Sequence, residues 1–116
     1  MNIYFQKKNI DIYAQDQDVM AERMCGLNKF FLYGTHVYVD LERTRASHNG
    51  RDLYYASIHI SEQGKKYFAE EYRENLHKAF SYAYENILRV VRNDKSKARN
   101  IARKAGQKIK SIFKRY

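Results

Sequence analysis

Three consecutive segments between residues 36 and 71 alternate apolar with polar side chains, and no other feature of the chain restricts its fold as strongly. A period of two places every second side chain on one face, as in a strand with one buried side. Asn49-Gly50 and Gln63-Gly64 separate the segments, and Asn-Gly is a strong signal for a two-residue hairpin turn. The pattern therefore predicts three antiparallel strands. Their core-facing positions are Val37, Val39 and Leu41 in the first, Tyr54, Ala56, Ile58 and Ile60 in the second, and Tyr67 and Ala69 in the third.

The chain before these strands contains one further strand pattern and one helix pattern. Ile3 and Phe5 alternate with polar residues in NIYFQKK, which predicts a first strand. A stripe of apolar residues at spacings of four, three and four then predicts a helix, and Gly34 is placed to cap its end in the left-handed conformation. The stripe consists of Met20, Met24, Leu27 and Phe31.

The chain after the three strands predicts a long second helix. Asn75 is suited to the N-cap, because an asparagine side chain accepts a hydrogen bond from a backbone N–H of the first turn. The chain contains no proline, so no proline breaks the helix that follows. Its apolar stripe is Leu76, Phe80, Ala83, Ile87 and Val91, and helical periodicity continues through Ile101, Ala105, Ile109 and Ile112.

These segments predict an α+β fold of the order β-α-β-β-β-α, with a four-stranded sheet and both helices packed on one of its faces. We expect residues 1–91 to form the β-α-β-β-β-α domain and residues 92–116 to form a basic helical extension. The expected core consists of Met20, Met24, Leu27, Phe31, Val37, Val39, Ile58, Ile60, Leu76, Phe80, Ile87 and Val91.

The charge of the chain lies almost entirely at its C-terminal end. Residues 92–116 contain ten basic residues and one acidic residue, Asp94, so this segment alone carries the net charge of +9 of the whole chain. Residues 1–91 hold twelve residues of each sign. Such asymmetry favours a polyanionic partner, which is nucleic acid or an anionic membrane surface, over a tail that only improves solubility.

Composition predicts a cytoplasmic protein. The single cysteine, Cys25, excludes an intramolecular disulfide and suits a reducing compartment. The first residues lack the charged and then apolar pattern of a signal peptide, and no apolar run approaches the roughly 20 residues that a membrane span needs.

The sequence does not predict an enzyme, a cofactor or a metal site. The four histidines do not fall at metal-ligand spacings, and we expect His36 and His59 to pair on the outer face of neighbouring strands. Cys25 lies in an apolar helical stretch, which indicates a packed residue. Glu70 and Glu71 point to opposite faces of a strand, and the five glycines are scattered.

Binding of RNA fits the pattern better, because lysine and arginine neutralise phosphates and release condensed counterions. The residues expected to bind RNA come from the first helix, the tip of the first hairpin, the exposed side of the second helix and the extension. They are Arg23, Arg43, Arg45, Arg51, Lys78, Arg89, Arg92, Lys95, Lys97, Arg99, Arg103, Lys104 and Lys108.

Three stretches carry a resemblance to the ribosome hibernation promoting factors, also called ribosome-associated inhibitors. The stretches are NIDI at residues 9–12, the passage from Leu27 through Lys29-Phe30-Phe31 to HVYVDL at residues 36–41, and NLHKAF at residues 75–80 running on to Ile87, Arg89 and Val91. The likeness covers about residues 2–97. Arg23, Arg89, Lys95 and Lys97 match basic positions of the family, whereas Gly26, Asn86 and Asn93 replace lysines.

The resemblance implies a short form of the family, without the C-terminal dimerisation domain, that binds the small ribosomal subunit and its ribosomal RNA in the decoding region. It implies no small-molecule substrate and no membrane, and it does not define an oligomeric state. The residues alone leave two other functions open. One is a general binder of double-stranded or structured RNA, and the other is a protein that binds a membrane surface or a partner through the basic amphipathic extension.

Overall fold

The computed structural model describes residues 2–31, 35–45 and 52–113, and for residues 45, 52 and 97–113 it describes the course of the backbone only. The elements are β1 (Asn2–Lys8), α1 (Ala14–Met24), the 3₁₀ helix η1 (Cys25–Phe30), β2 (His36–Arg45), β3 (Asp52–Glu62), β4 (Lys65–Arg73) and α2 (Leu76–Phe113). The predicted order β-α-β-β-β-α is therefore confirmed.

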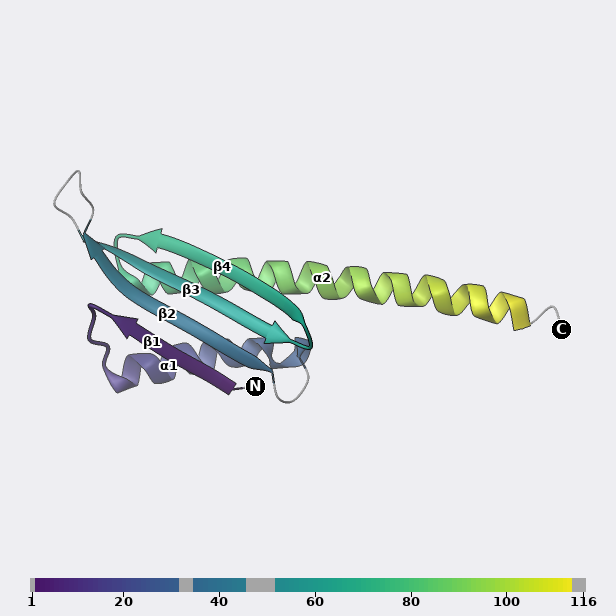
Figure 1. Cartoon of the computed structure of the whole chain (residues 1–116), viewed down its shortest axis with the longest axis horizontal. Coiled ribbons are helices and arrows are strands. Elements are labelled where there is room, and N and C mark those ends of the chain that lie inside the picture. The colour runs from purple at the N-terminus through teal and green to yellow at the C-terminus, as the bar shows by residue number, and fades with distance from the viewer. Residues whose placement is uncertain (1, 32–34, 46–51, 114–116) are drawn as a thin grey trace.

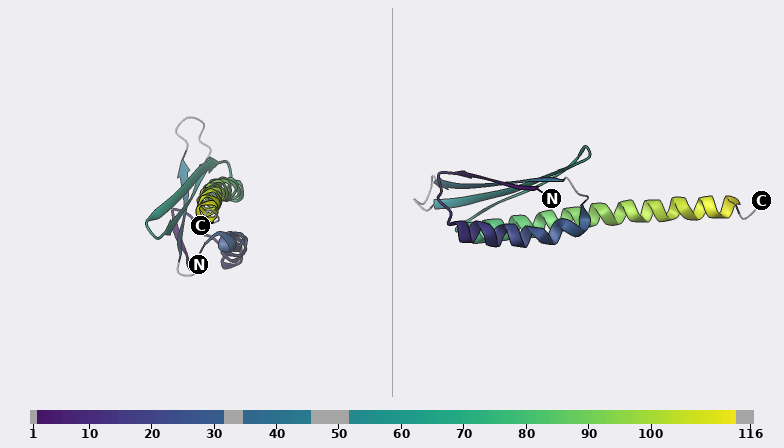
Figure 2. Two further views of the ribbon diagram at one scale, coloured as in Figure 1. Left: turned by 90° about the vertical axis from the view of Figure 1, so that its right-hand side faces the viewer. Right: turned by 90° about the horizontal axis from the view of Figure 1, so that it is seen from below.

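The four strands form one mixed sheet in the order β1-β2-β3-β4. β1 runs parallel to β2, and the remaining neighbours are antiparallel. The parallel pair requires a crossover connection, which α1 and η1 provide. α1 and α2 cover the same face of the sheet, as predicted, and none of the described helices lies on the opposite face (Figures 1 and 2).

The turn between β3 and β4 is the one that the sequence predicted. Gln63 and Gly64 have φ angles of 46° and 84°, and two positive φ values are what a type I′ hairpin turn requires. β2 and β3 pair antiparallel as predicted, with Arg45 opposite Asp52, and the turn expected at Asn49-Gly50 stays a prediction. Residues 46–51, which contain the predicted turn, lie outside the described residues.

The core lies between the sheet and the two helices. Of the twelve residues expected there, only Phe31 and Leu76 are half-buried rather than buried. Phe31 differs because α1 ends at Met24, the chain tightens into η1, and the backbone is extended at Phe31. The predicted helix end near Gly34, which lies outside the described residues, is therefore wrong for α1.

α2 begins as predicted and extends well past the sheet. The side-chain oxygen of Asn75 accepts a hydrogen bond of 2.8 Å from the backbone N–H of Lys78, which is an N-cap. The 38 residues of α2 correspond to about 57 Å at roughly 1.5 Å per residue. Figure 1 shows the C-terminal part of α2 projecting beyond the strands. The backbone passes residue 91 without a break, and the assignment of residues 1–91 and 92–116 to separate units stays a prediction.

Replacing Ile87 by alanine tests the packing of α2 on the sheet. Ile87 is fully buried, so we expect Ile87→Ala to lower the free energy of unfolding by about 2–5 kcal/mol, through lost burial and the cavity left behind. Val90 lies on the same helix but is 45% exposed, and Val90→Ala should change stability by less than about 1 kcal/mol. Urea denaturation of both variants measures the difference, and equal effects would contradict this packing.

Candidate nucleic-acid interface

The outer side of α2 presents three of the predicted RNA-binding residues, Lys78, Arg89 and Arg92, and all three are exposed. The ammonium of Lys78 lies 2.7 Å from the Glu74 carboxylate, and Arg89 donates a hydrogen bond to the side chain of Asn86. The Lys78 hydrogen bond lowers the pKa of Glu74, and Glu74 in turn raises the pKa of Lys78. An exposed pair of this kind adds little stability, so Lys78 can exchange Glu74 for a phosphate.

Arg23 joins α1 to α2. Its guanidinium donates a hydrogen bond of 2.8 Å to the Ser81 hydroxyl, lies 4.0 Å from Glu85 and stacks 5.1 Å from the centre of the Tyr84 ring. Gly26 leaves room for the Tyr84 side chain, because a β-carbon at residue 26 would lie 2.5 Å from the Tyr84 hydroxyl. The positive charge of Arg23 therefore lies beside α2 and extends its basic side across the pair of helices.

A group of five residues fastens α2 to the β3–β4 turn, and we call it the α2 clasp: Glu62, Lys65, Tyr67, Asp94 and Lys95. Lys95 lies 2.7 Å from Glu62, and Lys65 lies 2.7 Å from Asp94. The Tyr67 hydroxyl also donates a hydrogen bond to Asp94. Lys95, a predicted RNA-binding residue, thus directs its charge toward the sheet, and its side chain is only 25% exposed.

The clasp shifts the titration of two of its members. The hydrogen bond from Lys65, followed by that from Tyr67, lowers the pKa of Asp94 below its ordinary value. Burial, followed by the hydrogen bond to Asp94, raises the pKa of Tyr67. The clasp is therefore strongest when Asp94 is ionised and Tyr67 is neutral.

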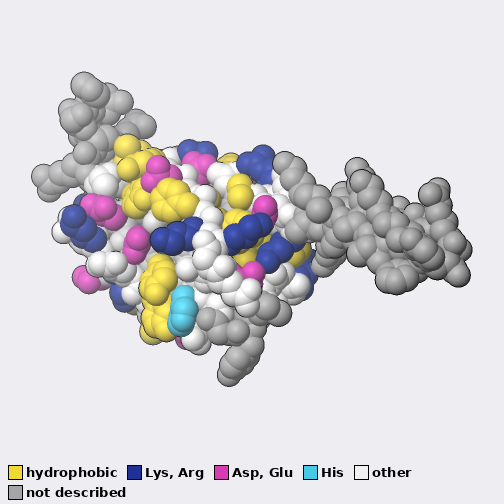
Figure 3. Space-filling view, turned by 45° about the vertical axis from the view of Figure 1, so that its right-hand side comes forward, with side chains coloured by type: hydrophobic (Ala, Val, Ile, Leu, Met, Phe, Trp, Pro, Cys, Tyr) yellow, Lys and Arg dark blue, Asp and Glu magenta, His cyan; other side chains and the backbone are white. Residues whose placement is uncertain are grey.

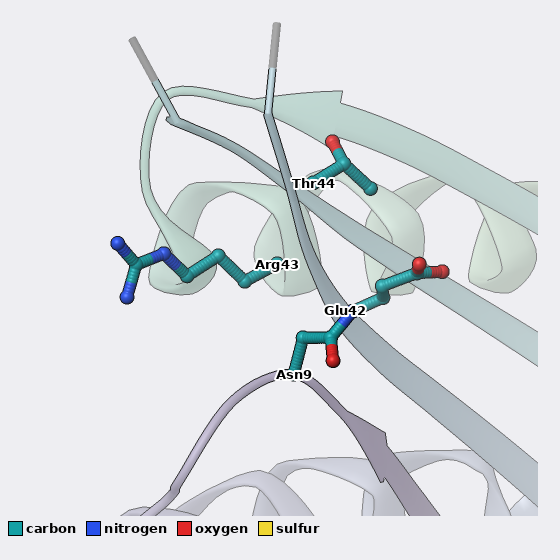
Figure 4. A pocket seen from close by; sticks show the side chains of 4 residues that line it. All are labelled: Asn9, Glu42, Arg43 and Thr44. Atoms are coloured by element: carbon teal, nitrogen blue, oxygen red, sulfur yellow. The ribbon is translucent and has the colours of Figure 1, made fainter.

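Arg43 lies apart from the basic side of α2. It lines a surface pocket near the end of β1 together with Asn9, Glu42 and Thr44. Figure 4 shows that Arg43 and Glu42 point to opposite sides of β2, so their charged groups do not converge on one bound molecule. Arg51 lies outside the described residues, and the other predicted residues are described by their backbone only: Arg45 at the end of β2, and Lys97, Arg99, Arg103, Lys104 and Lys108 in α2.

Two expectations about individual side chains are wrong. His36 and His59 do not pair, because His36 lies opposite Ser61 and His59 lies opposite Tyr38. Each imidazole lies beside a tyrosine ring instead. The ring centres are 5.9 Å apart for His36 and Tyr4, and 6.2 Å apart for His59 and Tyr38. Cys25 is exposed rather than packed, since it begins η1 on the side away from the core.

Glu70 and Glu71 lie on opposite faces of β4, as predicted. Glu70 accepts a hydrogen bond of 2.8 Å from the Tyr55 hydroxyl, whereas Glu71 lies 2.9 Å from Arg73. Across the described ranges, no three His, Cys, Asp or Glu residues are grouped so that they could hold a metal ion. No helix in those ranges is both long enough and apolar enough to cross a membrane.

A row of aromatic side chains that was not predicted from the sequence lies on the face of the sheet opposite the two helices. Tyr4, Tyr38, His59 and Phe68 come one from each strand and lie directly opposite one another in the register. We call them the open-face row. The alternation pattern contained the signal, because these residues occupy positions between the core-facing ones. The signal was not recognised because the pairing register that aligns them was unknown.

Residues 3–99 match the family described as sigma 54 modulation protein / S30EA ribosomal protein. Two solved structures are similar in fold. The Protein Y N-terminal domain of Thermus thermophilus is 22% identical with a TM-score of 0.61, over 83% of this chain and 98% of that one. A ribosomal subunit interface protein from Coxiella burnetii is 10% identical with a TM-score of 0.63, and the match covers 83% of this chain and 99% of that one. No curated protein sequence matches significantly.

Acid should weaken the α2 clasp before it affects the core. The pKa of Asp94 lies below its ordinary value of 3.8 in the folded protein, so its contribution to stability is complete above that value and is lost as the pH falls through the folded pKa. We therefore expect Asp94→Asn to destabilise the protein at pH 7, and the difference from wild type to shrink below about pH 4. Urea denaturation over a pH series measures this.

Tyr67→Phe provides the matched control at the other end of the pH scale. The pKa of Tyr67 is raised above 10.0, so its contribution persists in acid until Asp94 is protonated and is lost only as alkaline pH passes the raised pKa. A constant difference between Asp94→Asn and wild type from pH 7 to pH 3 would show that Asp94 is not held as an ion by the clasp.

Proposed function

Because the chain belongs to the sigma 54 modulation protein / S30EA ribosomal protein family, we propose that it is a ribosome-binding hibernation factor that inhibits translation. The family is ribosome-associated, and the match over residues 3–99 carries the proposal, since it spans all four strands, α1 and most of α2. It agrees with the family expected from the sequence. The finer parts of the proposal are the small subunit as partner, its decoding region as the site, and basic side chains in contact with ribosomal RNA.

The basic side of the two helices supports contact with RNA. Arg23, Arg89 and Arg92 lie on exposed parts of α1 and α2, and α2 leads directly into the segment that holds the excess charge. Phosphate contacts by such residues supply affinity without reading a base sequence. A protein that binds folded ribosomal RNA needs this kind of affinity, and shape then determines where it binds.

The shape of the molecule supports a binding site that is a channel lined by RNA. The chain is long and narrow, with principal extents of 72 × 30 × 20 Å, and α2 projects along its long axis (Figure 1). A narrow body with a basic helical extension fits between RNA walls better than it fits on a flat surface. Occupation of the decoding region would block messenger RNA and transfer RNA without any chemical step.

Co-sedimentation with ribosomes distinguishes this proposal from general binding of structured RNA. We expect the full chain to sediment with isolated small subunits at moderate salt, and a large excess of double-stranded RNA should not displace it, because duplex RNA offers phosphates but not the shape of the site. Isolated large subunits provide the control. Displacement by duplex RNA at equal phosphate concentration would instead favour the general binder.

The salt dependence of binding tests the role of the extension. If Arg99, Arg103 and Lys104 each contact a phosphate, replacing all three by glutamine should flatten the slope of log affinity against log salt by about 2–3, at roughly 0.7–0.9 per contact. A matched variant removes three exposed charges from the strands: Lys7, Lys8 and Lys66. This control should leave the slope nearly unchanged. Equal slopes for both triple variants would show that the extension is not the electrostatic anchor.

A further inference from the structure

The open-face row forms a continuous exposed aromatic surface across all four strands. Neighbouring ring centres are 5.3 Å apart for Tyr4 and Tyr38, 6.2 Å for Tyr38 and His59, and 6.3 Å for His59 and Phe68. Tyr4, Tyr38 and Phe68 are each 43–53% exposed. Aromatic rings at this exposure leave apolar area in water and offer their ring faces to a partner.

Two carboxylates lie beside this row without a cationic partner. Asp40 and Glu70 lie on either side of Ser57 in the register. This set is two residues along the strands from Tyr38, His59 and Phe68, and it therefore lies on the same face of the sheet. Asp40 accepts a hydrogen bond of 3.4 Å from the Ser57 hydroxyl, and Glu70 accepts one of 2.8 Å from the Tyr55 hydroxyl. Within the described part of the chain, neither carboxylate forms an ion pair with a lysine or an arginine.

A second aromatic pair closes the other side of these carboxylates. Tyr55 and Tyr72 follow on the same face, with ring centres 4.8 Å apart. Asp40 and Glu70 thus lie between two sets of rings, of which Tyr4, Tyr38, Phe68 and Tyr72 are exposed. Figure 3, an oblique view of this side of the molecule, shows hydrophobic side chains with both acidic and basic ones beside them.

We propose that this open face binds a basic polypeptide segment, with arginine side chains stacked on the rings and paired with Asp40 and Glu70. A guanidinium combines a flat face that stacks on aromatic rings with a fork of donors that matches a carboxylate. The open face provides both partners side by side. An extended segment presents alternate side chains to one side at about 6–7 Å intervals, which is similar to the spacing of the rings.

The charges of the open face argue against single-stranded RNA as its ligand. Surfaces on which bases stack combine aromatic side chains with a positively charged groove that follows the phosphates. Here Asp40 and Glu70 lie next to the row on one side, and Lys66 lies next to it on the other side. Lys8 lies on the same face but is 3.9 Å from Glu42. Phosphates near the rings would meet two uncompensated carboxylates.

This inference goes beyond the proposed function and uses none of the basic residues that the proposed function needs. The excess positive charge lies at residues 92–116, and both helices lie on the far side of the sheet from the open face (Figure 2). A protein with these two sides would bind RNA through its helices while a basic protein segment docks on its sheet. Failure of either interaction leaves the other testable.

Binding of a labelled peptide to the full chain tests the proposal directly. The probe is a ten-residue peptide of alternating arginine and glycine, and fluorescence anisotropy measures its affinity. Because the chain carries a net charge of +9, long-range electrostatic repulsion would oppose binding of this cationic peptide. We expect Asp40→Asn combined with Glu70→Gln to weaken binding roughly fivefold, from the loss of two exposed ion pairs. Phe68→Ala should weaken binding about threefold through loss of a cation–π contact.

The substitutions preserve the sheet, and a matched control isolates the position of the charges. The side-chain amide oxygens that Asp40→Asn and Glu70→Gln introduce would still accept the hydrogen bonds from Ser57 and Tyr55, so urea midpoints should match wild type. Asp18→Asn combined with Glu22→Gln removes two exposed carboxylates from α1 and should change affinity by less than about twofold.

Three outcomes would overturn the proposal. The first is no measurable binding of the peptide to the wild-type chain. The second is an equal loss of affinity in the α1 control, which would indicate nonspecific attraction. The third is that binding of a ten-residue uridine oligomer depends on Phe68 whereas binding of the arginine peptide does not. This result would assign the open face to RNA. A lysine–glycine peptide should bind more weakly than the arginine one, since an ammonium does not stack as a guanidinium does.

Discussion

The length of α2 relative to the sheet determines most of what the molecule can do. α2 extends for about 57 Å, whereas the 11 residues of β3 span about 36 Å. The helix can bury its apolar stripe only where strands lie beneath it, and Val91 is the last buried residue among the α2 side chains that the structure describes. The C-terminal part of α2 extends beyond the sheet, and it continues in the direction of the part that packs on the strands. The basic extension is therefore a continuation of a helix anchored in the core.

The α2 clasp lies at the point where the helix leaves the sheet. Asp94 and Lys95 form oppositely directed ion pairs with the β3–β4 turn at 2.7 Å each, and Lys95 also lies 5.2 Å from the ring centre of Phe31. These contacts fix the turn of α2 that lies beside the β3–β4 turn. They also commit Lys95, a predicted RNA-binding residue, to structure, so the phosphate contacts of the proposed function rest on Arg23, Arg89, Arg92 and the extension.

The two sides of the sheet have different physical properties because all of the helical mass lies on one of them. The buried side is filled by Val37, Ile58, Phe80 and their neighbours, and the helices above it present arginine and lysine to solvent. The open side has no such cover and presents rings and carboxylates. A single layer of strands thus separates a basic surface from an acidic and aromatic one, and each suits a different class of partner.

Local pattern in the sequence determined the elements and the core of this protein. Alternation identified the strands, the spacing of Phe80, Ala83 and Ile87 identified the buried side of α2, and Asn75 marked its first turn, because these signals depend on neighbours within one or two turns. The distribution of charged residues along the chain identified the positive extension. The family resemblance, and with it the proposed partner, also came from the order of short motifs along the chain.

Only the tertiary structure decided which residues from distant segments meet. The register between β2 and β3 separated His36 from His59 and aligned the open-face row, although strand periodicity is the same in any register shifted by two residues. The end of α1 at Met24 exposed Cys25, and the approach of α2 to the β3–β4 turn engaged Lys95 with Glu62. Such contacts join residues about 20 to 60 positions apart, and a pattern read over a few neighbouring residues carries no information about them.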